Sequence, residues 1–555
     1  MLHDLVLTAP LLILLFAALF TLVVDAFLPS SANRSFWGYF GAAASAASVL
    51  AAAGLWKFGG ALEMHTTAFS HQLSMGPYSL FFIALTGICA MVTHLSSPKY
   101  MSEHGSGWGE YYALLHFAAF GMGAMVAAES LLTLFVGLEI MSMAIYVLVA
   151  IKRTSQASVE AGMKYFIMGS VASAFLLYGM AFLYGLSGST GYLEISLALA
   201  KPGVNTLWLA LAVLLTSAAF LFKVAAVPFH MWTPDAYEGA PTPITGLMSS
   251  AVKAAGFAAL LKFLYACLGG PAMSSLHAQV PALFATIAVV TMTVGNLLAL
   301  TQKSAKRTLA YSSIAHAGYL LLGCVAFVAD PNLPGYQQPT GAVPFYLVGY
   351  AFASLAGFSA LTVLGKGGEE RTDEEQIIGL GRNYPFAGAV LALAMISLAG
   401  VPPTLGFFGK LQLARDVLGV EGGKYLPYII ILVLNSVVSA YYYLRITVWV
   451  YMRPEPKQTP EYIRETSLQW AMGIAAVGIL LVGILPQRAL QLGARGVASI
   501  RTPAALQSLR YELAKPGAQP GAQPVAQPVA QPVAQPLAKA AEAPAPVEAK
   551  PAAEN

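Results

Sequence analysis

Long apolar runs separated by short polar loops follow one another along most of the chain. The runs recur at roughly 18–28 residues, the length of a helix that crosses a bilayer at about 1.5 Å rise per residue. We therefore predict an all-α polytopic membrane protein with about fourteen transmembrane helices. The predicted spans cover roughly 5–27, 36–56, 75–97, 110–128, 130–151, 160–186, 205–234, 242–269, 279–300, 307–329, 343–365, 385–418, 425–452 and 468–486.

Lysine and arginine are unevenly distributed between the loops on the two sides of the predicted bundle. Thirteen lie in loops that follow odd-numbered spans and four in loops that follow even-numbered spans. By the positive-inside rule the N-terminus lies outside, and fourteen spans return the C-terminus to the same side. The residues from Met1 to Leu5 carry no positive charge before the first span, so we predict a retained helix rather than a cleaved signal peptide.

Proline interrupts two of the predicted spans near their middle. Span 7 contains Lys223 and then Pro228, and span 12 contains Pro402 and Pro403 followed by Lys410. Proline removes a backbone hydrogen bond, so both helices should open, which the membrane tolerates only inside the protein or beside a wet cavity. Because the two spans lie five apart, they cross in opposite directions. This predicts two inverted five-helix repeats, spans 4–8 and 9–13, each with a broken helix.

These features divide the chain into five parts. We predict a three-helix segment (1–109), a first five-helix repeat (110–269), a second five-helix repeat (279–452), a final transmembrane helix with a C-terminal segment (453–511), and an Ala/Gln/Pro-rich tail (512–555). The tail contains five copies of (Gly or Val)-Ala-Gln-Pro. Proline at every fourth residue prevents a helix, and there is too little apolar bulk for a core. We predict a disordered or polyproline-type linker, with a docking role as the alternative.

Composition excludes several classes of protein. Hydrophobic residues make up 57% of the 555 residues and charged residues only 10%, against about 45–50% and 25% in soluble domains. The mean hydropathy of +0.66 therefore rules out a soluble globular enzyme. A net charge of +4 without a basic patch gives no indication of nucleic-acid binding. Three scattered cysteines and the absence of nucleotide-binding motifs predict no redox cofactor, metal or ATP site on this chain.

A few charges lie inside predicted spans, where each costs at least about 2.5–3.5 kcal/mol and by default indicates function. Four of them are far from any span end and have no partner within helical reach: Glu139, Lys223, Lys253 and Lys410. Lys253 and Lys262 are nine residues apart, on opposite faces of one helix, and the deeper Lys253 is the better candidate for the bundle interior.

Other polar residues in the predicted spans can be explained without a role in function. Lys262 and Arg445 lie near span ends, where long side chains can reach the interface. Lys164 follows a glutamate by four residues, so an ordinary helical ion pair is as good an explanation as a relay role. His316 shares its segment with hydroxyl groups that can order water, and relay and packing both remain open. His230 lies beside the first break, where structural capping is equally consistent.

Buried lysines suit proton transfer. Burial destabilises the charged ammonium and brings a lysine toward the range in which it gains and loses protons, and a nearby carboxylate opposes that effect. Sodium and potassium ions need several oxygen ligands and are repelled by ammonium groups. We therefore predict that the transported species is the proton.

Four motifs resemble subunit N of bacterial NADH–quinone oxidoreductase, respiratory complex I, over roughly residues 5–490. They are Glu160-Ala-Gly-Met-Lys164-Tyr-Phe, Lys223 with Pro228-Phe-His230-Met-Trp-Thr-Pro-Asp235, Lys306-Arg307 with Tyr311-Ser-Ser-Ile-Ala-His316, and Gly400-Val-Pro-Pro-Thr-Leu-Gly-Phe-Phe-Gly-Lys410.

The resemblance implies a proton-translocating, antiporter-like subunit of the membrane arm. By resemblance, Glu139 and Lys223 are the coupling pair, Lys253 is the central relay lysine and Lys410 is the lysine of the outer half-channel. The NADH, flavin, iron–sulfur and quinone sites are expected on other subunits. The implied partners are other membrane-arm subunits, including sister antiporter-like subunits, and the lipid bilayer. The implied location is the bacterial inner membrane, with both termini on the periplasmic side.

Two alternatives remain at this stage. A subunit of a multi-component cation/proton antiporter would share the fold, and a purely structural membrane spacer would leave the buried charges unexplained. Sister subunits of complex I carry a carboxylate in place of Lys410 or a long amphipathic helix after span 14, and neither feature is present. The repeated tail departs from the usual ending of the resembling family.

Overall fold

Helices occur at all fourteen positions that the apolar pattern predicts. The computed structural model describes residues 2–500, apart from residues 30, 59–65, 270–274, 277, 330–339, 369, 371 and 455–460. Among these residues, twelve helices are long and apolar enough to cross a membrane, or up to thirteen if a bent pair counts as one span. They are α2 (Ala9–Ala26), α3 (Phe36–Phe58), α4 (Pro77–Ser96), α7 (Leu131–Val149), α8 (Gln156–Ser187), α10 (Thr206–Lys223), the segment Thr242–Cys267, α14 (Gln279–Leu300), α15 (Ala305–Val328), α16 (Ala342–Thr362), α21 (Leu426–Tyr451) and α22 (Thr466–Ile484). The remaining two predicted positions hold α6 (Gly109–Ala127) and the broken pair α19 (Pro385–Ala399) and α20 (Leu405–Leu418).

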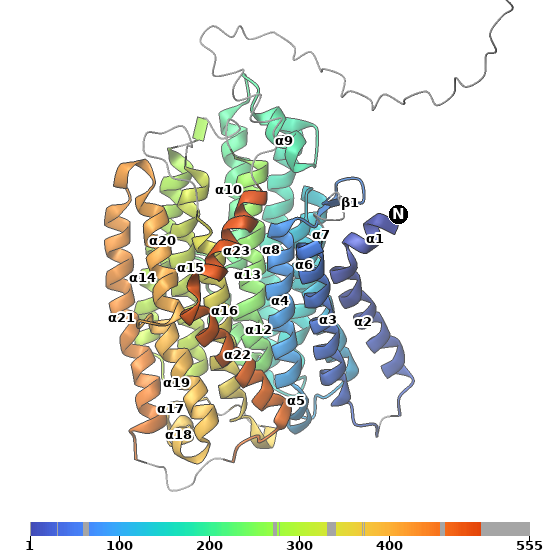
Figure 1. The fold of residues 1–555 in the computed structure, drawn as a ribbon, viewed down its shortest axis with the longest axis vertical. Helices are drawn as coiled ribbons and strands as arrows, with labels where there is room; N and C mark the ends of the chain where they lie inside the picture. The colour runs from blue at the N-terminus through green and yellow to red at the C-terminus, as the bar shows by residue number, and fades with distance from the viewer. Residues whose placement is uncertain are drawn as a thin grey trace, which may run out of the picture. The chain divides into compact units, whose positions relative to one another are not determined.

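Short elements mark the two ends of the bundle (Figure 1). One end, which we call the basic end, carries the loops with Lys99, Lys152 and Lys303. Its short helices are α5 (Pro98–Glu103), α17 (Glu374–Ile377) and α18 (Leu380–Asn383). The opposite end carries α1 (Leu2–Leu7), α9 (Tyr192–Leu199) and a small hairpin of β1 (Thr67–Ala68) and β2 (Leu73–Ser74).

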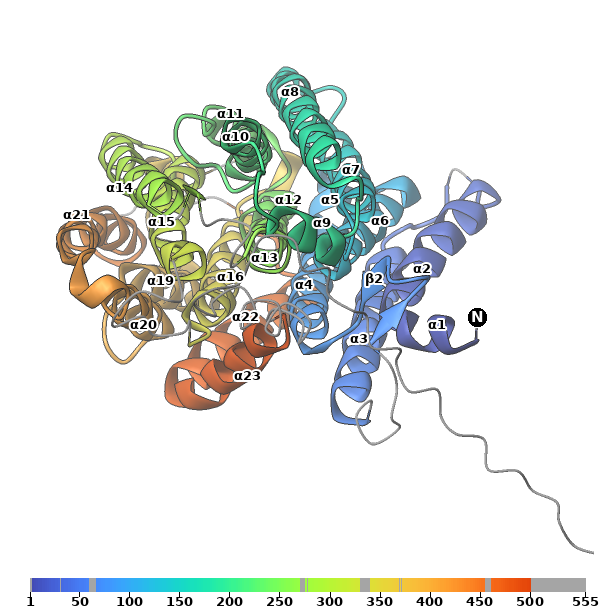
Figure 2. The same cartoon turned by 90° about the horizontal axis from the view of Figure 1, so that it is seen from above.

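Three spans form the centre of the bundle, as Figure 2 shows from above. The apolar window of Thr242–Cys267 is completely buried, and those of α15 and α16 are 94% buried, whereas the windows of α2, α3 and α8 are only 33% buried. The segment Thr242–Cys267 consists of α12 (Thr242–Leu247), α13 (Lys253–Lys262) and two π-helical turns, Met248–Val252 before α13 and Phe263–Cys267 after it. Lys253, Lys262 and Lys306, which lie on these central helices, are therefore enclosed by protein.

Two glycines allow α14 and α15 to cross at very short range. A Cβ atom added to Gly295 would lie 2.6 Å from the backbone nitrogen of Ala315, and one added to Gly318 would lie 2.4 Å from that of Met292. Small residues that let backbones approach closely are common in membrane helix pairs. His316, a predicted site residue, stands between these contacts on α15.

Both predicted helix breaks are present. α10 ends at Lys223, and α11 (Trp232–Gly239) begins only after the segment that contains Pro228. α19 ends before Pro402 and Pro403, and α20 begins just after them. The peptide bonds that precede Pro228 and Pro403 are cis.

The last span continues into an amphipathic helix that the sequence analysis did not predict. α22 is followed by α23 (Pro486–Ser499), which packs against α4 and α16. The hydroxyl of Ser499 accepts a hydrogen bond of 3.1 Å from the backbone nitrogen of Tyr78 at the start of α4. The Ala/Gln/Pro-rich tail lies outside the described residues.

Candidate functional site

The break between α10 and α11 places Lys223 inside the bundle and is closed by side chains of the same chain. The indole Nε1 of Trp232 donates to the carbonyl of Phe222 at 3.1 Å, and the backbone nitrogen of Val227 donates to the Thr291 hydroxyl at 3.0 Å. Two backbone groups at the break, the Phe222 carbonyl and the Val227 nitrogen, are thus hydrogen-bonded to side chains. The segment between α10 and α11 is therefore held in place by these bonds, and Lys223 lies at the end of α10.

Lys223 is held by neutral groups. It is 3% exposed. Its Nζ donates to the hydroxyls of Ser142 at 2.7 Å and Tyr146 at 3.1 Å, both on α7, and lies 5.7 Å from the ring centroid of Tyr165. Hydroxyl oxygens and aromatic ring faces stabilise a charged ammonium. Because these groups carry no charge, they lose little interaction energy when the lysine becomes a neutral amine.

Glu139 lies beside this group but is not in contact with Lys223. Its carboxylate accepts a hydrogen bond from Ser173 on α8. Ser142, which binds Lys223, follows Glu139 by three residues on α7, so the two side chains share a helix face. Within the part of the chain that the structure describes, no ion pair joins Glu139 to Lys223. Glu139 and Lys223 therefore lie near the same face of α7, where Ser142 binds Lys223.

Lys253 begins α13 and is directed at α15. It is 1% exposed, and its Nζ donates to both the hydroxyl and the carbonyl oxygen of Ser313 at 2.5 Å. The Tyr237 hydroxyl lies 3.3 Å from the Ser313 hydroxyl, and the Tyr350 ring centroid lies 5.6 Å from Nζ. The central lysine thus also has only neutral partners among the described residues.

His316 is bonded through both ring nitrogens. Its Nδ1 lies 2.7 Å from the Tyr346 hydroxyl and its Nε2 lies 3.0 Å from the Tyr443 hydroxyl. The Tyr443 hydroxyl in turn bonds to Ser312. His316 lies one turn from Ser313, the partner of Lys253, on the same helix. The imidazole is therefore both packed and connected to hydroxyl groups, so the two alternatives of the sequence analysis coexist in the geometry.

The second break supplies the partners of Lys410. Its Nζ donates to the carbonyls of Ala399 at 3.1 Å and Leu398 at 3.5 Å, which are the last residues of α19. These carbonyls are free because the helix ends there, and a helix C-terminus carries partial negative charge. The ring centroid of Tyr319 lies 5.2 Å from Nζ. Lys410 is 8% exposed.

Three other lysines are equally buried but bind carboxylates. Lys262 is 2% exposed, and its Nζ lies 3.0 Å from Glu129. Lys152 and Lys306 both pair with Glu370, at 2.8 and 3.3 Å. We call Lys152, Lys262 and Lys306 the end lysines, because they lie near the ends of the bundle, and Lys223, Lys253 and Lys410 the mid-bundle lysines.

The structure gives the remaining candidates local roles. Lys262 lies near an end of the bundle, as the sequence analysis expected, but it is 2% exposed and paired there with Glu129, which is 27% exposed. Arg445 donates to the carbonyls of Leu300 at 2.8 Å and Gln302 at 2.7 Å, at the end of α14.

Lys164 lies at the surface of the basic end and is not brought together with the mid-bundle lysines. Its side chain is 47% exposed and pairs with Glu160 at 2.8 Å, the helical pair that the sequence suggested, and with Asp235 at 2.9 Å. His230 precedes α11, and its carbonyl accepts from the backbone nitrogen of Thr233 at 3.0 Å.

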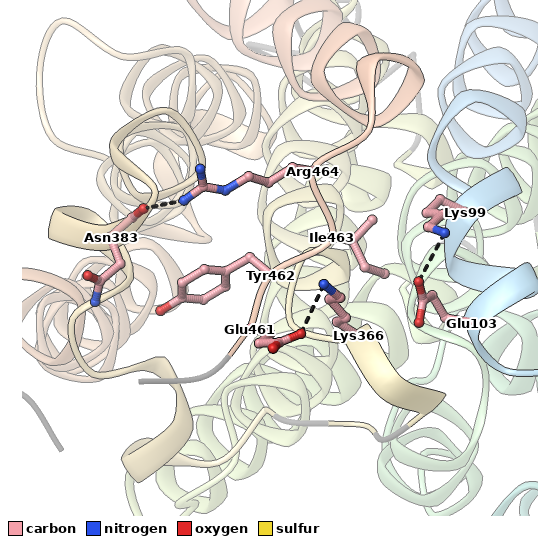
Figure 3. A pocket seen from close by; sticks show the side chains of 8 residues that line it. All are labelled: Lys99, Glu103, Lys366, Asn383, Glu461, Tyr462, Ile463 and Arg464. Carbon is pink, nitrogen blue, oxygen red and sulfur yellow. Dashed lines mark hydrogen bonds and ion pairs between the residues drawn. The ribbon is translucent and has the colours of Figure 1, made fainter. Parts of the chain in front are cut away.

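A surface pocket at the basic end is separate from these lysines (Figure 3). Its volume is about 480 Å³, and its charges are already paired, Lys99 with Glu103 at 3.1 Å and Lys366 with Glu461 at 2.9 Å. Arg464 donates to the carbonyl of Asn383 at 3.0 Å. The pocket therefore offers surface ion pairs, which contribute little energy, and no group of the candidate site.

The sequence analysis missed the neutral partners of the site. Tyrosines from four helices (Tyr146, Tyr319, Tyr346 and Tyr443) and serines from three (Ser142, Ser173 and Ser313) contact the charged residues. One signal was available, since Ser142 follows Glu139 by one helical turn. The other partners come from different helices, and no local pattern connects them to the lysines.

Comparison with known proteins first defines the class. Residues 128–438 match the family model described as "NADH:quinone oxidoreductase/Mrp antiporter, TM". The fold is shared with a chain of the Mrp complex from Dietzia sp. DQ12-45-1b, at a TM-score of 0.75 and 18% identity over 92% of this chain and 99% of that one. This likeness concerns the fold alone, and the predicted antiporter-like architecture is confirmed.

More similar proteins define the family within this class. The chain is 42% identical over 435 residues to NADH-quinone oxidoreductase subunit N 1 of Sorangium cellulosum, covering 77% of this chain and 84% of that one. It is 36% identical over 512 residues to subunit N of Myxococcus xanthus, covering 86% and 94%. A chain of respiratory complex I from Thermus thermophilus has a TM-score of 0.72 and 31% identity over 88% of this chain and all of that one. The chain belongs to the NADH-quinone oxidoreductase subunit N family.

Proposed function

We propose that this chain is a proton-translocating membrane-arm subunit of an NADH-quinone oxidoreductase, in which the mid-bundle lysines carry the proton. Family membership supports the complex, the substrate pair and the partners, which are other membrane-arm subunits with antiporter-like folds. The observation that carries the lysine assignment is their bonding. All three are buried, yet each binds only hydroxyls or carbonyls among the described residues.

The proposed order of transfer follows the bundle from the first break to the second. Lys223 receives the proton, Lys253 relays it past Ser313 to His316, and Lys410 releases it beside the end of α19. Glu139 modulates Lys223 through the helix face that it shares with Ser142. Lys164, exposed at the basic end, is at most an entry-side charge in this scheme.

The energies involved are compatible with this role. Each elementary charge that crosses the membrane works against about 2.3 kcal/mol per 100 mV. A change of one pKa unit in a carrier corresponds to about 1.36 kcal/mol. Moving a carboxylate such as Glu139 toward or away from an ammonium changes its proton affinity by amounts of this order. A partner subunit would therefore need to change the pKa of a carrier lysine by only a few units.

The complex I function fits better than a cation/proton antiporter. Relatives that match at 36–42% identity are subunits N, whereas the Mrp chain shares only the fold. The ammonium groups of the site also repel metal cations. Sodium-dependent transport by a complex without NADH oxidation would favour the antiporter.

Cofactor sites and topology complete the proposal. Cys89, Cys267 and Cys324 are buried on different elements, and no three His, Cys, Asp or Glu side chains gather for a metal in the described part of the chain. These residues do not fit an iron–sulfur cluster, and we place the flavin, clusters and quinone on other subunits. We place the basic end on the cytoplasmic side of the bacterial inner membrane, both termini on the periplasmic side, and the two repeats at 110–269 and 279–452.

The test is Lys253→Ala in the assembled complex, reconstituted in vesicles. Proton pumping and quinone-linked turnover should fall at least about tenfold, because the relay loses its central carrier. NADH oxidation by an artificial acceptor on the peripheral arm should be unchanged. Lys366→Ala, which removes an exposed paired lysine, is the matched control. Normal pumping by Lys253→Ala would contradict the proposal.

A further inference from the structure

A buried group of charges at the basic end has no place in the relay described above. One carboxylate oxygen of Glu370 accepts from Lys152 at 2.8 Å. The other accepts from the hydroxyl of Thr242 at 2.7 Å and lies 3.3 Å from Lys306. We call these four residues the Glu370 cluster.

The Glu370 cluster lies where the two repeats meet. Lys152 comes from the loop between α7 and α8, and Thr242 begins α12, both in the first repeat. Lys306 is in the first turn of α15, and Glu370 lies in the loop after α16, both in the second repeat. Lys306 is completely buried, whereas the Glu370 side chain is 22% exposed. Water at the basic end therefore reaches the carboxylate before it reaches the buried lysine.

Glu370 and Lys152 titrate in the same range. Burial raises the pKa of Glu370 to about 8 and lowers the pKa of Lys152 to about 8. Below that pH Glu370 gains a proton, and above it loses one, so the group changes state close to neutrality.

Three other titratable groups lie near the Glu370 cluster. His104 faces Lys152 and Lys306, and burial, together with these two lysines, lowers its pKa to about 4. It is therefore uncharged at neutral pH. The other two are carboxylates: Glu238 accepts from Ser304 at 3.2 Å and its charge acts on Lys306, and the charge of Glu103 acts on His104.

One face of α15 connects the Glu370 cluster with the central lysine. Lys306 and Ser313 are seven residues apart, which is two turns on the same face and about 10 Å along the axis. Ser313 binds the Nζ of Lys253 through both its hydroxyl and its carbonyl. The Tyr237 hydroxyl lies beside Ser313. Tyr237 is on α11 and is followed in the chain by Glu238. A proton on Lys306 is thus two helical turns from the partner of Lys253.

We propose that Glu370 is a proton-loading carboxylate that takes protons from the basic end and passes them through Lys306 toward Lys253. This is a second inlet, at the seam between the repeats, and does not pass through Lys223. Chemically, the carboxylate accepts a proton from water or a buffer acid and donates it to the neutral amine of Lys306. The inference rests on the proposed role of Lys253.

The test measures NADH–quinone turnover of the assembled complex with an uncoupler present. Glu370→Gln keeps the size and the bond to Thr242 but cannot load a proton. We expect turnover near wild type at about pH 6.5 and at least about threefold lower at about pH 8.5, because direct protonation from solution slows as protons become scarce. Glu461→Gln, which removes an exposed carboxylate of the same end, should follow the wild-type pH profile.

Chemical rescue separates loading from a structural role. Glu370→Ala leaves a space between the lysines that formate, a small weak acid, can occupy. Formate should restore turnover of Glu370→Ala at about pH 8.5 severalfold, while leaving wild type and Glu461→Gln unchanged. If Glu370→Ala does not assemble, the pH profile of Glu370→Gln still tests whether Glu370 loads protons.

Two results would overturn the inference: a loss in Glu370→Gln that is equal at both pH values, or a wild-type profile. Lys253→Ala, measured in parallel, keeps the two hypotheses apart. If Lys253→Ala cannot pump but Glu370→Gln is normal, only the second inlet is refuted. If Lys253→Ala pumps normally, the proposed relay itself is refuted.

Discussion

The mid-bundle lysines and the end lysines are buried to the same extent but differ in what they bind. Lys253 is 1% exposed and Lys262 is 2% exposed, on one helix. Lys253 donates to Ser313, whereas Lys262 pairs with Glu129. Removing a proton from Lys262 would leave the carboxylate without its counter-charge, which is costly in a protein interior. Removing one from Lys253 leaves a neutral amine among neutral groups. Burial therefore does not distinguish Lys253 from Lys262, and the chemistry of the partner does. Lys306 is a separate case, because in the inlet proposed above its partner Glu370 itself takes up the proton.

The strongest test of this comparison converts one type of lysine into the other. Ser313→Asp would give Lys253 a carboxylate partner like that of Lys262. The new ion pair should hold the proton on Lys253, so pumping and turnover should fall at least about tenfold, a barrier of about 1.4 kcal/mol or more. Ser313→Thr, which keeps the hydroxyl, is the control. Wild-type pumping by the assembled Ser313→Asp complex would show that partner chemistry is not the deciding property.

A weaker perturbation removes the carboxylate near the first mid-bundle lysine. Glu139→Gln should lower turnover and pumping about fivefold, because Lys223 loses the charge that modulates it. The double variant with Lys223→Ala should be little worse than Lys223→Ala alone, since both changes affect one coupled unit. Ser142→Ala should weaken this coupling. NADH oxidation by an artificial acceptor is the control, and simple addition of the two losses would exclude a coupled pair.

The next effect decides between relay and packing for His316. His316→Phe preserves an aromatic ring but removes the bonds to Tyr346 and Tyr443. If the imidazole passes protons, pumping should fall about threefold while the assembled complex keeps its thermal stability. His316→Gln, which keeps hydrogen-bonding atoms, should lose less. Unchanged pumping in His316→Phe would assign the imidazole to packing.

The smallest expected effect concerns exposed paired lysines. Lys366→Ala breaks the ion pair with Glu461 at the surface pocket of Figure 3. Such pairs contribute about 0–1 kcal/mol, so assembly, turnover and pumping should remain within experimental error of wild type. A clear loss of pumping would mean that this pocket takes part in function.

Local patterns in the sequence were sufficient to predict the spans, both breaks and the buried position of the mid-bundle lysines. Apolar runs define helices by length, and proline defines a break by removing a hydrogen bond. The sequence could not predict what each charge contacts. The pairing of Lys262 was missed because its partner Glu129 lies in the connection between α6 and α7, far from Lys262 in the chain. Glu370 was overlooked because segments far apart in the chain enclose it. These contacts depend on tertiary packing, which periodicity does not encode.

The glycine crossing of α14 and α15 has a mechanical consequence. At Gly295 and Gly318 the backbones of the two helices are in direct contact, with no side chain between them. A sliding or rotating movement of one helix against the other would therefore produce steric overlap. We therefore expect α14 and α15 to move as one rigid unit that includes Ser313 and His316 of α15. Rearrangements during turnover are accordingly expected in the side chains that face α14 and α15, and not in the position of these two helices relative to each other.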